Sequence, residues 1–451
     1  MEGLSTMKAP PLDPPRRLVR IATLGFAFLL PFLTWPEAAG CALLALIFYV
    51  SILPQLEPNR AEPAGRWSGS LLTPGSAALY PLSMLAVVLI FRHQMMVVAA
   101  VWAILALGGG VAEIAGSSWS RPPLPWNPRK SWPAFATFIL AGTAGAYVLA
   151  RWVAPAVSIH RTLNLCLATA AVGALVSSAP IRLDDNLAVA LAASGFMFCA
   201  LLIERSALDS NLPYLGVRIV LAISVNAVFA LVAWALRFAT RSGAVAGFAL
   251  GVAIYLGYGW KSFLILFGFF VLGSVATKLG YAKKLARGIA QGRGGARTWR
   301  EASANLLPAA FFSILVIITH REAAFLAAFT AVLAEAAGDT VSSETGKWLS
   351  ERAYLITTLE PVPAGADGGV SLPGTMAGVL ASTAIAGLSV ALGICRPGAA
   401  DLALGAGVAG NLLDSLLGAT LERRGLLTNG AVNFAATSFA GALTLAFLLA
   451  K

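Results

Sequence analysis

The polar stretch Gly338–Lys347 follows an almost wholly apolar segment and contains Asp339, Glu344 and Lys347. Glu335 lies one helical turn before Asp339, so on a helix the two carboxylates share a face and repel each other unless a cation lies between them. Mg²⁺ prefers oxygen ligands, and we therefore expect Glu335, Asp339 and Glu344 to hold it. Lys347 would then neutralise a phosphate group. The alternative is a set of solvated charges at the end of a helix.

Small and hydroxyl-bearing residues accompany these charges and a second polar loop downstream. Ser342 and Ser343 lie inside the first stretch, where small side chains allow a phosphate to approach the backbone closely. Asp367, Gly368 and Gly369 form a turn whose backbone N–H groups make a nest for phosphate. An ordinary surface turn is the alternative for this second motif.

A third polar group lies near the end of an apolar run, where Asn411 and Asp414 share a helix face. Asp414 has no basic residue in its own predicted helix, so its partner is either a bound metal or the stretch Gly338–Lys347. Asn433 adds a polar group at the start of the next predicted helix. The carboxylates that we expect to take part in catalysis are Asp339, Glu344, Asp367 and Asp414.

A basic loop precedes these motifs, and its arginines alternate with glycines between Arg287 and Arg297. Such a loop can wrap a polyanion, because guanidinium groups bind phosphate oxygens in pairs. The alternative is a solvated loop that touches anionic lipid, and the two roles are compatible. The residues expected to bind substrate phosphate or nucleotide are Lys347, Arg293, Arg297, Ser342, Ser343, Gly368, Gly369 and Asn433.

Composition places the chain among the polytopic membrane proteins. Of its 451 residues 58% are hydrophobic and 12% are charged, and the mean hydropathy is +0.78. Apolar runs of roughly 17–23 residues recur from Leu18 onward, each long enough to cross a bilayer. We expect an all-α integral membrane protein with about 15 transmembrane helices in two halves.

We expect a tail at residues 1–20 and membrane domains at 21–236 and 241–451. Basic residues gather in short loops, so the net charge of +11 indicates orientation in the bilayer and not nucleic-acid binding. Alternate counting of spans places the N-terminus and the polar motifs on the cytoplasmic side of an inner or plasma membrane of bacterial type. Glycines recur at every fourth position at Gly243, Gly247 and Gly251, and we call them the glycine ladder. This spacing predicts a helix-packing face and not a ligand site.

The polar motifs occur together, and in one order, in a known family. The second half, from Arg241 to Lys451, resembles the membrane family that includes the plant phytyl-phosphate kinase. The resemblance runs through the basic loop and through Gly338–Glu344, Leu355–Pro363, Gly365–Ser371, Asp414–Ala419 and Asn429–Asn433. It implies the transfer of a phosphoryl group from a nucleoside triphosphate (CTP, UTP or ATP) to a phytyl or other prenyl monophosphate, with Mg²⁺ as the cofactor.

The first half resembles the phytol and dolichol kinases of the phosphatidate cytidylyltransferase superfamily, through Gly108–Gly116 and Leu124–Trp132. That superfamily carries an acidic residue where Gly109 stands, so a metal ligand is missing here. The half is therefore either a prenol kinase with altered metal binding or a support for the fold. Its candidate site residues are Glu113, Lys130 and Ser131.

Two other classes of function fit the same residues. Carboxylates inside the membrane also bind coupling ions in transporters, and a prenyl-lipid-binding protein would keep the phosphate-binding groups without catalysis. Within the enzyme class, a cytidylyltransferase would release pyrophosphate. The gathering of acids at one predicted face favours a kinase whose isoprenoid substrate lies between helices, where each buried methylene contributes about 0.8 kcal/mol.

Overall fold

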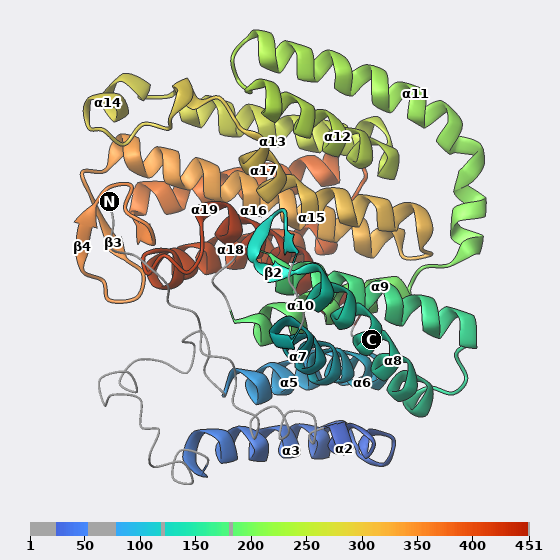
Figure 1. Ribbon diagram of the computed structural model, residues 1–451. Helices are drawn as coiled ribbons and strands as arrows, with labels where there is room; N and C mark the ends of the chain where they lie inside the picture. The colour runs from blue at the N-terminus through green and yellow to red at the C-terminus, as the bar shows by residue number, and fades with distance from the viewer. Residues whose placement is uncertain (1–23, 53–77, 119–121, 180–183, 450–451) are drawn as a thin grey trace. The chain divides into compact units, whose positions relative to one another are not determined.

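The computed structural model describes residues 24–52, 78–118, 122–179 and 184–449 (Figure 1). The predicted tail at residues 1–20 lies outside these. The chain forms two compact units, Met1–Leu201 and Leu202–Lys451, which we call unit 1 and unit 2. The division lies before α11 (Arg205–Ala235), whereas the sequence suggested one after it, because α11 packs against α12 (Arg241–Tyr258). The functional assignment of the two predicted domains stays a prediction.

Unit 1 is a helical bundle with one short antiparallel hairpin. Its helices are α2 (Leu24–Ala27), α3 (Trp35–Ile47), α5 (Leu79–Ile90), α6 (Met95–Ala103), α7 (Gly110–Ser118), α8 (Trp132–Val153), α9 (Ile159–Ser178) and α10 (Asp185–Leu201). A π-helical segment, η4 (Ile104–Gly109), joins α6 to α7, and the hairpin pairs β1 (Pro123–Leu124) with β2 (Asn127–Ser131). The helix α6 is apolar all round and buried, as expected for a helix that others surround.

Unit 2 holds the remaining helices and a small three-stranded sheet. The helices after α12 are α13 (Trp260–Lys278), α14 (Tyr281–Ala286), α15 (Trp299–Ile318), α16 (Glu322–Leu349), α17 (Leu372–Ala391), α18 (Pro397–Leu417) and α19 (Asn429–Leu449). A π-helical segment, η6 (Gly418–Glu422), extends α18. The antiparallel sheet has the order β4-β3-β5 and consists of β3 (Arg352–Leu355), β4 (Pro361–Pro363) and β5 (Gly369–Val370).

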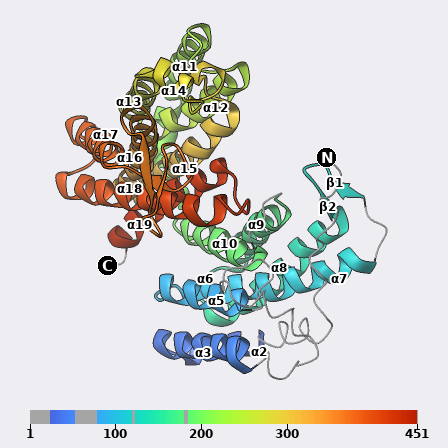
Figure 2. The same cartoon turned by 90° about the vertical axis from the view of Figure 1, so that its left-hand side faces the viewer.

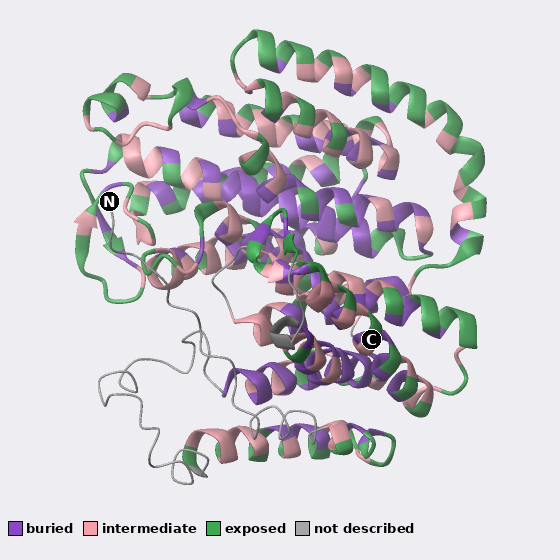
Figure 3. Ribbon diagram, in the orientation of Figure 1, coloured by how far each residue is buried: buried purple, intermediate pink, exposed green. Residues whose placement is uncertain are grey.

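The helix α16 is the core of unit 2. It packs against α13, α15, α17, α18 and α19, and Figures 1 and 2 show it running between them. Figure 3 shows that buried residues follow its length, and every residue from Ala324 to Gly338 is buried. Glu335 lies within this buried run, and Asp339 follows it half-buried.

Glycines let α17 and α18 approach α16 closely at the level of these carboxylates. A Cβ added at Gly378 of α17 would lie 2.8 Å from the carbonyl oxygen of Gly338. A Cβ at Gly410 of α18 would lie 2.6 Å from Cγ of Glu335. Real Cβ atoms do not approach so closely, so the small residues set the distance between the backbones here.

An all-α polytopic membrane protein is confirmed, but with fewer long helices than expected. Within the part of the chain that the structure describes, 10 helices are long and apolar enough to cross a membrane, and three shorter apolar helices accompany them. Of the first predicted span, which begins at Leu18, the structure describes the helix α2 of 4 residues, and the residues before Leu24 lie outside the described part. The side of the membrane on which the polar motifs lie stays a prediction.

Candidate functional site

Four carboxylates gather where α16, α18 and η6 meet, and we call Glu335, Asp339, Asp414 and Glu422 the acidic cluster. The charge of Asp339 acts on each of the other three, and that of Asp414 acts on Glu335. Asp367, on the loop before β5, lies near enough to act on Glu422. The structure therefore brings together three of the predicted acids and places a fourth at their edge.

The acidic cluster contains oxygens that other described residues leave without hydrogen bonds. Glu335 is 1% exposed, and neither of its carboxylate oxygens has a hydrogen-bond partner. Oδ2 of Asp414 is also buried without one. Because buried polar atoms are nearly always paired, and unpaired carboxylates are costly, these oxygens indicate a place for a cation.

Two asparagines connect Asp339 to the neighbouring helices. Nδ2 of Asn433, at the start of α19, donates to Oδ2 of Asp339 over 3.5 Å and to Oδ1 of Asn305 over 3.4 Å. Asn433 Oδ1 is buried without a partner among the described residues. Asn433 therefore lies beside Asp339 together with Asn305 of α15, and its binding of phosphate stays a prediction.

Arg297 and Lys347 supply positive charge beside Asp339, and both act on its carboxylate. The backbone of Arg297 is held by the linker between α11 and α12: its N–H donates to Phe238 O (2.9 Å) and its carbonyl accepts from Thr240 N (2.9 Å). A Cβ at Gly243 would lie 2.1 Å from that carbonyl oxygen, so only glycine allows this path. The predicted phosphate-binding pair therefore lies beside the acidic cluster.

Glu344 does not complete a metal cage, contrary to the prediction. Its Oε2 accepts from Nζ of Lys284 (2.5 Å) and its Oε1 accepts from Nζ of Lys347 (3.1 Å). Lys284 is 0% exposed and also donates to the carbonyl oxygens of Ala276 (3.1 Å) and Thr277 (2.9 Å). Glu344 is thus a buried structural partner that holds Lys347 in place, while Lys347 keeps N–H donors for a phosphate.

The other residues of unit 2 that were predicted to bind phosphate have no described contact with the acidic cluster. Ser342 lies against α17, because its carbonyl oxygen would be 2.7 Å from a Cβ at Gly374. Oγ of Ser343 donates to the carbonyl oxygen of Thr340 (3.1 Å). Arg293 is exposed, with a positive φ of 55°. Their binding of phosphate stays a prediction.

The turn at Asp367–Gly369 serves to seat a loop on η6. The N–H of Gly369 donates to the carbonyl oxygen of Ala366 (2.9 Å), so it is not free to form the predicted phosphate nest. Gly368 has a φ of 70°, and a Cβ there would lie 2.2 Å from the backbone nitrogen of Ala419. This close approach holds Asp367 beside Glu422.

Replacing Gly368 by alanine should lift this loop from η6 and lower both stability and any activity. The strain of a left-handed alanine contributes about 1–3 kcal/mol, and the contact with Ala419 adds to it. Gly288 is a matched control, because its φ is also 70° but a Cβ there meets nothing within 4 Å. Thermal unfolding of the two alanine variants in detergent measures the difference. Equal melting temperatures would contradict the close packing.

Two of the three predicted site residues of unit 1, Lys130 and Ser131, make structural contacts. Nζ of Lys130 pairs with Oδ2 of Asp185 (2.7 Å), which also accepts from Oγ of Ser177 (3.0 Å). Oγ of Ser131 accepts from Ala134 N (3.4 Å) and caps α8. Glu113 is half-buried on α7. A catalytic role for this half stays a prediction.

Sequence reasoning missed three residues of this region: Lys284, Asn305 and Glu422. Glu422 precedes two arginines, Arg423 and Arg424, and so counted only as part of an orientation signal. Lys284 was one of many charges in the basic loop. Asn305 stands alone in an apolar run, and a polar residue there is itself a signal of function.

Similar proteins cover the same part of the chain. The family model described as "Integral membrane protein DUF92" matches residues 224–441, which include the acidic cluster. Membrane protein MJ0933 of Methanocaldococcus jannaschii is 35% identical over 228 residues, 50% of this chain and 92% of that protein. The chain belongs to the DUF92 family of integral membrane proteins.

Two further DUF92 relatives extend the comparison. Membrane protein sll0875 of Synechocystis sp. is 35% identical over 191 residues, 41% of this chain and 72% of that protein. Protein VTE6, chloroplastic, of Arabidopsis thaliana is 35% identical over 187 residues, 41% of this chain and 56% of that protein. No solved structure matches the chain.

Proposed function

We propose that this DUF92 protein is a membrane phosphotransferase that moves a phosphoryl group from a nucleoside triphosphate to an isoprenoid monophosphate and forms the diphosphate. The observation that carries the proposal is the meeting of the acidic cluster with Arg297 and Lys347 where several membrane helices of unit 2 pack together. The resemblance to the family of the plant phytyl-phosphate kinase, and the similarity to VTE6, support an isoprenoid phosphate as the acceptor.

The residues present fit magnesium with few protein ligands. Among the described residues, no three His, Cys, Asp or Glu side chains lie close enough together to hold a metal by themselves. Mg²⁺ commonly binds one or two carboxylates and completes its shell with water and substrate phosphates. Asp339 and Asp414 are the residues that would hold it. When bound, it would neutralise the charge that develops on the phosphates.

The cations of the site bind and orient the phosphates. Arg297 would bind the oxygens of the acceptor phosphate with its planar guanidinium group, and Lys347 would bind the donor. An acceptor phosphate oxygen forms a bond to the γ-phosphorus while the bond from that phosphorus to the β–γ bridging oxygen breaks. The nucleoside diphosphate leaves with those electrons. Because the acceptor is already an oxyanion, the site needs no strong base.

Purified protein in liposomes, given phytyl or geranylgeranyl monophosphate, Mg²⁺ and each of CTP, UTP and ATP, tests the proposal. We expect the prenyl diphosphate and the matching nucleoside diphosphate in equal amounts. Pyrophosphate release with CTP would indicate a cytidylyltransferase, and ion-driven uptake of the prenyl phosphate would indicate a transporter. If no donor yields diphosphate, the proposal is wrong.

A further inference from the structure

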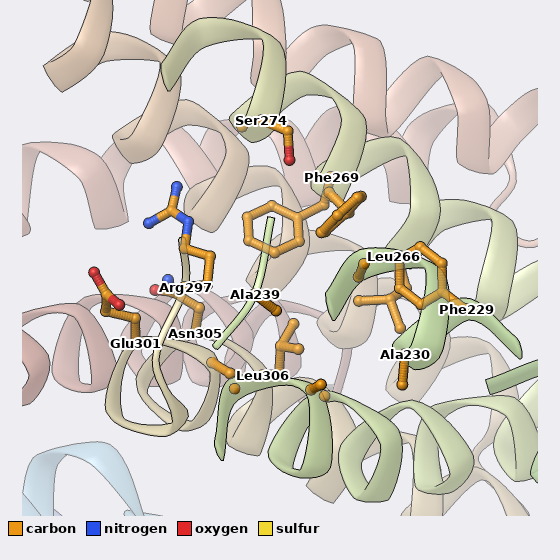
Figure 4. Close-up of a pocket in the computed structure, with 17 residues that line it drawn as sticks. Phe229, Ala230, Ala239, Leu266, Phe269, Ser274, Arg297, Glu301, Asn305 and Leu306 are labelled. Atoms are coloured by element: carbon orange, nitrogen blue, oxygen red, sulfur yellow. The ribbon is translucent and has the colours of Figure 1, made fainter. Parts of the chain in front are cut away.

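A pocket lies in unit 2 between α11, α12, α13 and α15 (Figure 4). Its polar end contains Arg297, Glu301 and Asn305, while Phe229 and Leu266 lie at the other end. The lining between them is almost wholly apolar. This lining matches a ligand with one charged end and an apolar body.

The polar end of the pocket continues into the candidate site. Arg297 lines the pocket and also acts on Asp339, and Asn305 lines it and accepts from Asn433, which in turn donates to Asp339. A phosphate bound at Arg297 would therefore lie beside the acidic cluster, with the rest of its molecule inside the pocket.

Arg297 is the cation at this end of the pocket, and its charge acts on the carboxylates of Glu301 and Asp339. The structure describes no hydrogen bond or ion pair from its guanidinium group to another described residue. Glu301 is occupied, since its carboxylate accepts from Thr298 N (2.7 Å), Thr298 Oγ1 (2.8 Å) and Gln291 Nε2 (2.8 Å). The N–H donors of the Arg297 guanidinium group are therefore the ones at this end that can bind a phosphate oxygen.

Aromatic rings pack together at the apolar end of the pocket. The ring of Phe229 lies 4.9 Å from that of Phe270, 5.6 Å from that of Phe263 and 5.9 Å from that of Phe267, centroid to centroid. Edge-to-face rings of this kind pack stably against one another. The position of Phe229 would therefore limit the length of a chain that enters from Arg297.

The glycine ladder of α12 divides into two roles. A Cβ at Gly243 would lie 2.1 Å from Arg297 O, and a Cβ at Gly251 would lie 2.1 Å from Asn226 Oδ1, so both glycines serve close packing as predicted. Gly247 lines the pocket, and a Cβ there meets nothing within 4 Å. The middle glycine therefore leaves room for a ligand.

We infer that this pocket holds the isoprenoid tail of the substrate, with its phosphate at Arg297, and that Gly247 and Phe229 determine which tails fit; this inference rests on the proposed function. The branched methyl groups of an isoprenoid would contact the aromatic and small residues of the lining. Burial of the methylene groups of the tail in this lining would favour binding.

A photoreactive probe tests this placement without any turnover. Geranylgeranyl monophosphate with a diazirine on its last isoprene unit is irradiated with the full-length protein in liposomes, in the absence of nucleotide. We expect cross-links on α11 and α13 near Phe229 and Leu266. Cross-links confined to other helices would overturn the inference.

Substitutions on α12 provide matched variants. Gly247→Leu should weaken binding of the probe about tenfold, since a leucine side chain takes the space of roughly two methylenes of the tail. Val245→Leu is the control, because Val245 is 69% exposed on the same helix and outside the pocket lining. Equal binding by the two leucine variants would contradict the inference.

Phe229→Ala provides a second measurement that does not depend on filling the pocket. It should shift the preference toward monophosphates longer than geranylgeranyl monophosphate in competition with the probe. An unchanged order of preference would contradict the role of Phe229. If the probe cross-links in the pocket but no diphosphate forms, the assignment of the tail site stands and the phosphotransferase proposal fails. If diphosphate forms but the cross-links lie on other helices, the phosphotransferase proposal stands and the assignment of the tail site fails.

Discussion

Asp339→Asn should reduce diphosphate formation by at least about a hundredfold while the protein stays folded, as expected when one group that stabilises transition-state charge is removed. Asparagine has the same shape and keeps an oxygen to accept from Asn433, so the packing of α16 against α19 survives. What is lost is the negative charge that attracts a cation between Asp339 and Asp414. Initial rates at saturating prenyl phosphate measure the effect.

Thermal unfolding separates loss of chemistry from loss of structure in this variant. Removing the charge of Asp339 relieves its repulsion with Glu335 and Asp414 but also removes its attraction to Lys347 and Arg297, so the melting temperature should change little. Asp401→Asn is the matched control, since Asp401 is exposed near the end of α18 that lies away from Asp414. Full turnover by Asp339→Asn would remove Asp339 from the mechanism.

Lys284→Met should destabilise the protein by about 3–5 kcal/mol, because it leaves one partner of a buried ion pair without the other. Lys284 is 0% exposed and Glu344 is 3% exposed. The methionine fills the volume but donates no hydrogen bonds to Glu344 or to the carbonyl oxygens of Ala276 and Thr277. Thermal or denaturant unfolding in detergent measures the loss.

Two companion variants show whether the ion pair is the cause. Lys283→Met changes the neighbouring, exposed lysine and should leave the free energy of unfolding nearly unchanged. The double variant Lys284→Met with Glu344→Met removes both charges and should recover much of the stability, since no buried charge is left alone. If the double variant is no more stable than Lys284→Met, the pairing does not explain the loss.

The sequence was sufficient for the elements and for part of the site. Apolar runs predict helices because their length is set by the bilayer, and the described chain is helical as expected, although some helices, such as α10, are shorter than a full span. The spacing of Glu335 and Asp339 placed both on one face of α16, and the structure adds Asp414 to them.

The rest depends on contacts between residues far apart in the chain. Glu344 and Asp339 look alike in the sequence, and only the approach of Lys284, 60 residues away, makes one structural and leaves the other in the acidic cluster. Likewise, Gly243 and Gly247 belong to one ladder, but the carbonyl group of Arg297 faces only the first. No local pattern carries such information.

The burial of α16 has a consequence for how the protein is made. Its most apolar window is 89% buried by other helices, whereas that of α11 is 11% buried. An acidic residue at the centre of a lone membrane helix costs about 2.5–3.5 kcal/mol on insertion. A nascent α11 can therefore enter the bilayer alone, whereas α16 reaches a stable place only when α17, α18 and α19, which are synthesised later, arrive to cover its acids.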